Sequence, residues 1–98
     1  MHKITGKIAT REVFIDDVKL HPGKSQKLYN HSPDGFAWGY GGSGPSQLAL
    51  AIMLEFTNAS NAMKLYQEFK RDVITELPKD DDFTLWFDYD QWMKDRKK

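Results

Sequence analysis

The stretch His31-Ser-Pro-Asp-Gly-Phe-Ala-Trp-Gly-Tyr-Gly-Gly-Ser-Gly-Pro45 leads directly into the apolar run Ser46-Gln-Leu-Ala-Leu-Ala-Ile-Met-Leu-Glu-Phe56. Five of the chain's seven glycines lie between Gly35 and Gly44. Glycine adopts backbone angles that other residues avoid, so a turn of unusual geometry leads here into a buried element. We expect the rest of the chain to pack around that element.

The apolar run over residues 47–56 is predicted to be a buried helix. It carries one charged residue, Glu55, and is too short to span a bilayer. Its leucine and alanine content favours a helix over a strand. Pro45 suits the first helical position, because the N–H that proline lacks would have no partner there, and Ser43 or Gly44 would be the cap.

Composition limits the classes of protein to which the chain can belong. Its 98 residues predict one domain, and 13 aromatic residues can fill a small core that has no cysteine to staple it. Fourteen basic and fourteen acidic residues cancel, so a general nucleic-acid binder is not expected. The N-terminus has no apolar signal core and no segment reaches membrane length, so we expect a cytoplasmic protein that does not contact a membrane.

Short strands are predicted where β-branched and aromatic residues gather between turn formers. They are expected at residues 3–8, 12–16, 18–20, 27–29 and 83–87. Residues 36–40 alternate large and small side chains, which would place Phe36, Trp38 and Tyr40 on one face of an extended segment. Because small sheets with exposed edges often pair, a homodimer or larger homo-oligomer stays open.

A second helix is predicted after residue 60, with Ser60 as its cap and Pro78 at its end. Its apolar residues recur at helical spacing on one stripe, at Ala62, Leu65, Tyr66, Phe69, Val73, Ile74 and Leu77. Asp88 is predicted to cap a last short helix. The expected architecture is α+β: an N-terminal antiparallel sheet packed against an antiparallel helical pair, with a short C-terminal strand and helix.

The glycine turn has two interpretations. A glycine-rich turn that opens a helix directs several free N–H groups and the positive end of a helix dipole at one point, which suffices to bind an anion. Alternatively, the glycines only allow helix and sheet to pack closely. The pattern matches neither the phosphate-loop motif nor the dinucleotide fingerprint.

The motifs His31-Ser-Pro and Gly39-Tyr-Gly-Gly-Ser-Gly-Pro45, with the later Leu65-Tyr-Gln-Glu-Phe-Lys70, resemble a family of small uncharacterised prokaryotic and phage proteins, a domain of unknown function. The resemblance covers about residues 3–78 and does not extend to the C-terminal third. It implies a frequent setting in phage and mobile elements, and no agreed activity.

The chemistry that the residues favour is the binding of a phosphorylated small molecule, most plausibly a nucleotide. The amides of Gly42, Ser43 and Gly44 would bind a phosphate, an aromatic ring from residues 36–40 would stack a base, and Arg11 or Lys70 would add positive charge. The full set of predicted ligand contacts is Arg11, His31, Ser32, Trp38, Tyr40, Gly41, Gly42, Ser43, Gly44, Ser46, Gln47 and Lys70. In a phage setting, such binding could sequester a host immune signal in the host cytoplasm.

Catalysis and metal binding are less well supported. A hydrolase could be assembled from His31, Ser32, Ser43 and Asp34. Pro45 stands where a nucleophile elbow needs its second glycine, so no catalytic residue is predicted. The aspartates at residues 80–82 lack the spacing of a calcium loop, and neither a metal nor a cofactor is expected.

The alternative function is a protein-interaction module that inhibits a host protein. Its surface would be the acidic segment from Asp80 to Asp90, with Trp86 and Trp92 as aromatic anchors. Both tryptophans could instead belong to the core of so small a chain.

Overall fold

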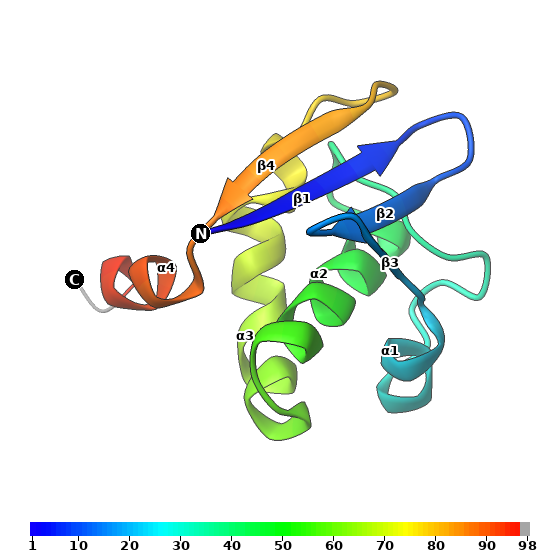
Figure 1. The fold of residues 1–98 in the computed structure, drawn as a ribbon. Helices are drawn as coiled ribbons and strands as arrows, with labels where there is room; N and C mark the ends of the chain where they lie inside the picture. Colours follow the sequence, from blue (N-terminus) through cyan, green and yellow to red (C-terminus); the bar gives the residue numbers. More distant parts are fainter. Residues whose placement is uncertain (97–98) are drawn as a thin grey trace.

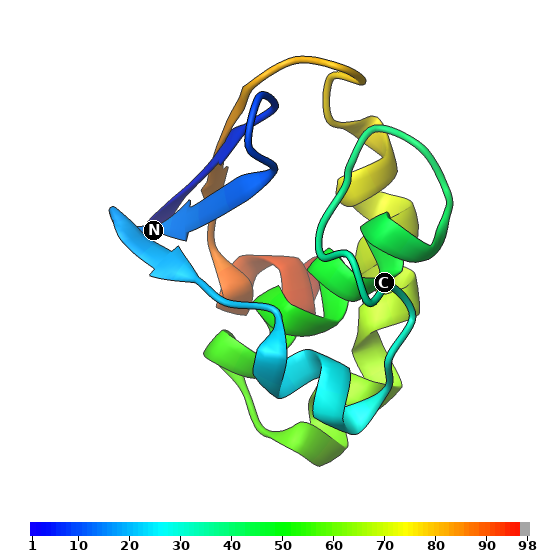
Figure 2. The ribbon, with the colours of Figure 1, turned by 90° about the vertical axis from the view of Figure 1, so that its right-hand side faces the viewer.

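The computed structural model describes residues 1–96, and these form a four-stranded antiparallel sheet in the order β3-β2-β1-β4. The strands are β1 (His2–Lys7), β2 (Glu12–Ile15), β3 (Val18–Leu20) and β4 (Phe83–Phe87). The helices are α1 (Gly23–Leu28), α2 (Ser43–Phe56), α3 (Ala59–Asp72) and α4 (Tyr89–Asp95), with a 3₁₀ turn, η1 (Ile74–Glu76). Figures 1 and 2 show α2 and α3 together on one side of the sheet. The predicted α+β fold class is confirmed.

The N-terminal strands form a meander because their turns are built from residues that tolerate left-handed backbone. Asp16 and Asp17 join β2 to β3 with φ angles of 50° and 67°. Arg11, with a φ angle of 61°, closes the turn between β1 and β2, and its N–H donates to the carbonyl of Lys7 at 2.7 Å. Aspartate is among the residues that tolerate left-handed backbone, so the Asp16-Asp17 pair itself favours a turn at this place.

The buried central helix α2 is confirmed, with a different start. Every residue from Gly44 to Met53 is buried. The cap is Gly42, not Ser43 or Gly44, and Pro45 is the third residue of the helix, not the first. The N–H of Ser46 donates to the carbonyl of Gly42 at 3.0 Å, so the helix begins before the proline. Pro45 still lies in the first turn, where its missing N–H would have no partner within the helix.

Helix α3 packs against α2 through the predicted apolar stripe. Ala62, Leu65, Tyr66 and Phe69 are its buried residues. The helix starts earlier than predicted, because the side chain of Asn58 accepts the N–H of Asn61 at 2.9 Å. The prediction of Ser60 as the cap is wrong, since this asparagine satisfies the first turn two residues before it.

The strand predicted at residues 27–29 is wrong, because α1 covers most of this segment. Ser25 is fully buried, and its hydroxyl donates to the carbonyl of Pro22 at 2.7 Å. This contact and a hydrogen bond from Gln47 of α2 hold a helical turn that the local pattern does not favour.

Residues 36–40 form an irregular segment and not a strand face. The N–H of Gly39 donates to the carbonyl of Ile74 at 2.9 Å, and its φ angle of 82° interrupts the extended backbone. Phe36 and Trp38 are consequently buried, whereas Tyr40 is 43% exposed. The prediction that these three aromatic residues share one face is wrong.

The C-terminal segment returns to the sheet. Strand β4, with the predicted bounds, lies beside β1 and pairs Leu85 with Ile4. The carboxylate of Asp88 accepts the N–H of Gln91 at 3.1 Å, so the predicted cap of α4 is confirmed. Arg96 binds Glu68 of α3 through two hydrogen bonds of 2.8 and 3.0 Å.

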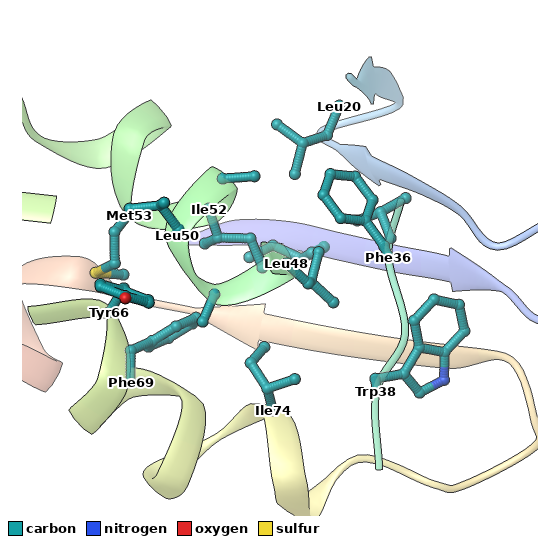
Figure 3. Close-up of a cluster of buried hydrophobic side chains, with 14 of the residues drawn as sticks. Leu20, Phe36, Trp38, Leu48, Leu50, Ile52, Met53, Tyr66, Phe69 and Ile74 are labelled. Carbon is teal, nitrogen blue, oxygen red and sulfur yellow. The ribbon is translucent and has the colours of Figure 1, made fainter. Parts of the chain in front are cut away.

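The core lies between the sheet and the helices, as the close-up in Figure 3 shows. Its largest fully buried side chains include Trp38, Phe69, Leu48 and Ile52. Within the described residues, no helix combines the length and apolarity that a membrane crossing needs.

Candidate functional site

The glycine turn lies at the start of α2, where the chain passes close to its own backbone. A Cβ on Gly44 would lie 2.6 Å from the Cβ of Ala37, so only glycine allows this approach. A Cβ on Gly42 would lie 2.6 Å from the ring of Tyr40, whereas one on Gly41 would meet nothing nearer than 3.9 Å. Close packing therefore explains Gly44, and it also explains Gly39, whose Cβ would lie 2.6 Å from the Cα of Lys79, but both contacts are with loop residues and not between helix and sheet.

A shallow depression of about 390 Å³ opens beside this helix start. It brings together residues that are far apart in the sequence: Arg11, Ser32, Asp34, Gly35, Phe36, Ala37, Tyr40, Ser43 and Gly44. Within the described residues, the amides of Ser43 and Gly44 have no backbone carbonyl as partner. Ser43 and Gly44 line the depression as the first two residues of α2, so the positive end of the α2 dipole lies beside it.

The charges around the depression are of both signs. Arg11 reaches it from the left-handed turn after β1, and Asp34 lies in the turn whose last residue, Gly35, has a φ angle of 108°. The N–H of Gly35 donates to the carbonyl of Ser32 at 3.3 Å. Sequence reasoning placed Arg11 here but did not place Asp34 in the binding set, although its Pro-Asp-Gly turn was identifiable.

A smaller depression of about 180 Å³ adjoins the first one and shares Arg11, Asp34, Gly35 and Phe36 with it. Leu20 and Pro22 add apolar walls there. Sequence reasoning did not predict these two residues near the glycine turn, because the approach of β3 to residues 34–36 is a tertiary contact.

Gln47 is a structural residue of the loop and not a free ligand contact. It is fully buried, and its Oε1 accepts the N–H groups of His31 and Ser32 at 2.8 and 2.9 Å. Its Nε2 donates to the hydroxyl of Ser25 at 2.9 Å and to the carbonyl of Tyr29 at 3.1 Å. All its hydrogen-bonding positions are used within the fold, so it holds Ser32 at the edge of the depression without facing a ligand.

His31 anchors the same loop. Its Nε2 lies 2.8 Å from the hydroxyl of Tyr66, and its ring stacks on Tyr29 with centroids 4.2 Å apart. Burial lowers the pKa of His31, and the nearby positive charge of Lys70 lowers it further. Among the described residues, the hydrogen-bond partner of this imidazole is a tyrosine hydroxyl, so His31 forms no pair there with Ser32 or Ser43.

Trp38 belongs to the core. It is 2% exposed, its ring packs edge-on against Phe83, and its Nε1 donates to the carbonyl of Asp81 at 2.9 Å. It is therefore not available to stack a base, which corrects the sequence-based expectation. Tyr40 remains accessible, and Lys79 Nζ lies 5.8 Å from its ring centroid.

The remaining predicted contacts divide between the depression and other places. Ser43 and Ser32 line the depression, whereas Ser46 is buried beneath the first turn of α2. Gly41 and Gly42 precede the helix without lining the depression, and Lys70 lies near His31 on α3 instead.

A larger depression lies elsewhere, on the outer face of the sheet. It measures about 500 Å³, and its walls include Lys3, Lys7, Phe14, Asp17 and Asp82. Two acidic and two basic side chains balance there, so it does not select an anion. Within residues 1–96, no group of histidine, aspartate and glutamate side chains is arranged to hold a metal ion.

A family model of proteins of unknown function, DUF6166, matches residues 2–95. The chain belongs to the DUF6166 family. The match extends beyond residues 3–78, to which the sequence-based resemblance was limited, and includes β4 and α4, so the C-terminal third is part of the DUF6166 domain. Searches of curated proteins and of solved structures found no match to the chain.

Proposed function

We propose that this DUF6166 domain binds a phosphorylated small molecule, of the nucleotide class, in the depression at the start of α2. The observation that carries the proposal is the meeting of Arg11, Ser32 and the first two residues of α2, Ser43 and Gly44, around one depression of about 390 Å³. That volume falls within the range of small-ligand sites. A phosphate beside Ser43 and Gly44 would take the amides, and Arg11 would add a charged hydrogen bond.

The base of the nucleotide would lie against Tyr40 or in the smaller depression that adjoins the first. Tyr40 is the accessible ring at the first depression, and Leu20 and Pro22 give the second an apolar wall. The carboxylate of Asp34 opposes an anion. The ligand's negative charge must therefore lie on the Ser43 side, away from Asp34.

Calorimetry with a panel of nucleoside mono-, di- and triphosphates and cyclic nucleotides tests the proposal. Arg11→Gln should weaken binding about tenfold, because it removes one charge-assisted hydrogen bond. Asp34→Asn should strengthen binding, since it removes the opposing charge. Lys24→Gln is the matched control, because it removes an exposed charge outside both depressions. Absence of heat with every nucleotide, together with an unchanged melting temperature, would refute the proposal.

The biological setting is also a proposal. The sequence motifs resemble those of phage proteins, so sequestration of a host immune signal in the host cytoplasm would suit a small protein that binds without catalysis. This step is an analogy from setting, and the site chemistry does not depend on it.

We propose protein docking as a second function because Trp86 is 62% exposed on β4. A large aromatic side chain left in water is typical of an interface anchor. Trp92 does not share this role, because it packs against Phe69 and Phe87. Trp86→Thr should abolish capture of a protein partner and leave nucleotide binding unchanged, whereas Tyr40→Thr should do the reverse. Equal capture by the wild type and Trp86→Thr would refute this second function.

A further inference from the structure

The free edge of β4 is an interaction surface that the fold leaves open. The strand order puts β4 at one edge, beyond β1. Within residues 1–96, no strand pairs with its far side, and Figure 1 shows that edge of the sheet without a neighbouring strand. An edge strand offers unpaired backbone groups to any extended chain that can lie beside it.

The hydrogen bonds of β1 show which residues face which neighbour. Asp16, next to β2, receives the N–H of Lys3 on its side chain at 2.9 Å and donates its own N–H to the carbonyl of Lys3 at 2.8 Å. Lys3 therefore directs its backbone groups toward β2. Because these directions alternate along a strand, Ile4 and Gly6 direct theirs toward β4.

The register transfers this alternation to β4. Leu85 lies opposite Ile4, and Phe83 lies opposite Gly6, so Leu85 and Phe83 point their backbone groups back toward β1. Thr84 and Trp86 alternate with these residues along the strand, so they direct their N–H and carbonyl groups away from β1, toward the free edge. Their side chains are both exposed on the outer face. The strand carries no lysine, proline or bulge that would protect the edge.

Charge decides which extended chain fits. Exposed aspartates flank the strand at both ends: Asp80, Asp81 and Asp82 precede it, and Asp88 and Asp90 follow it. A second copy of this chain fits poorly, because two-fold pairing about Leu85 would place Asp82 opposite the Asp88 of that copy. Like charges that face each other across a strand pair are destabilising.

We propose that an extended segment of another protein, with basic residues at both ends, adds to the sheet as a strand beside β4. Thr84 and Trp86 would form its backbone hydrogen bonds, the Trp86 ring would cover its side chains on the outer face, and the flanking aspartates would attract its basic ends. This inference rests on the docking function proposed above and specifies the class of partner and the mode of contact.

The test uses the whole chain and a short synthetic peptide of alternating valine and threonine with lysine at both ends. In an NMR titration, the amides of Thr84 and Trp86 should shift and become protected from hydrogen exchange. A peptide with a single N-methylated amide on its bonding edge should bind up to about tenfold more weakly, because one lost hydrogen bond costs about 0.5–1.5 kcal/mol. A glutamate-ended peptide should bind at least about threefold more weakly. Thr84→Pro removes an outward N–H and should weaken binding similarly, whereas Thr84→Val should not.

The outcomes separate the inference from the docking function. Strand addition is refuted if the N-methylated peptide binds as well as the unmodified one, or if no amide of residues 83–87 shifts. The docking function would still be supported in that case if Trp86→Thr lost the capture of a protein partner. If sedimentation shows a dimer that Thr84→Pro dissociates, the occupant is a second copy and the basic partner is refuted. Equal binding of the lysine-ended and glutamate-ended peptides would overturn the charge argument.

Discussion

Replacing Gln47 by methionine tests whether the buried amide holds the binding loop. Methionine keeps the length and nearly the volume of glutamine, so packing changes little. It removes the acceptor that the N–H groups of His31 and Ser32 share, and the donor to the carbonyl of Tyr29. The N–H of His31 keeps a 3.2 Å hydrogen bond to the carbonyl of Tyr29, so the Ser32 N–H is the backbone group left without a partner. The three lost hydrogen bonds to backbone groups cost about 1 kcal/mol each, so Gln47→Met should lower the free energy of unfolding by about 2–4 kcal/mol.

That loss is large for a domain of this size, whose total stability is about 5–15 kcal/mol. Urea unfolding followed by tryptophan fluorescence, to which Trp38, Trp86 and Trp92 contribute, measures the loss, and the melting temperature should fall by roughly 10–25 °C. Ser25→Ala is the matched control. It removes the hydrogen bond from Gln47 and the one to the carbonyl of Pro22, so it should cost about 1–2 kcal/mol, but it leaves the amides of His31 and Ser32 bonded to Gln47.

Hydrogen exchange identifies the cause of the loss. In Gln47→Met, the amides of His31 and Ser32 should exchange faster than the remaining loop amides. A loss below about 1 kcal/mol, with unchanged exchange at these two amides, would refute the reasoning that this side chain fixes the loop.

The remaining predictions concern packing and protonation. Gly44→Ala should destabilise the fold by about 1–3 kcal/mol in chemical unfolding, because the new Cβ would lie 2.6 Å from the Cβ of Ala37. Gly41→Ala is the control and should cost little. Equal losses of stability in the two variants would contradict the close contact between Gly44 and Ala37. The pKa of Asp16 is lowered by hydrogen bonds from His2 and from the Lys3 amide. The stability that the Asp16 carboxylate contributes should therefore be present above its unfolded pKa and lost as pH falls through its folded pKa. Melting curves of Asp16→Asn should lack this loss at low pH. The pKa of His31 is lowered from 6.5, so the stability of the fold should decrease as pH falls through 6.5 toward the folded pKa of this imidazole. Lys70→Met should raise the pKa of His31 in an NMR titration. An unchanged titration would show that Lys70 does not act on the imidazole.

Several elements follow from local sequence because their stabilising contacts are close in the chain. The turn at Asp16 and Asp17 depends on two residues that tolerate left-handed backbone. The cap of α4 joins Asp88 to Gln91, three residues away. The apolar composition of α2 requires a buried helix whichever way the chain folds around it, so the prediction held apart from the first residues of the helix.

The candidate site was predicted only in part. Arg11, Ser32, Ser43, Gly44 and Tyr40 do meet at the depression, as the sequence analysis expected. Trp38 and Gln47 were expected to contact the ligand, and both are inside the fold instead. An aromatic ring or an amide in a glycine-rich stretch has the same local pattern whether it faces a ligand or the core, so sequence could not distinguish the two roles.

The sequence by itself determined the α+β class, the central buried helix and the place of the glycine turn at its start, because composition and periodicity decide which segments must be buried. Tertiary structure alone decided that α1 is helical, that β4 lies beside β1 and that Gln47 bonds to the loop. Those outcomes depend on contacts between residues far apart in the chain, such as Ser25 with Gln47, 22 residues apart. No local pattern records which distant partner will satisfy a buried polar group or an open strand edge.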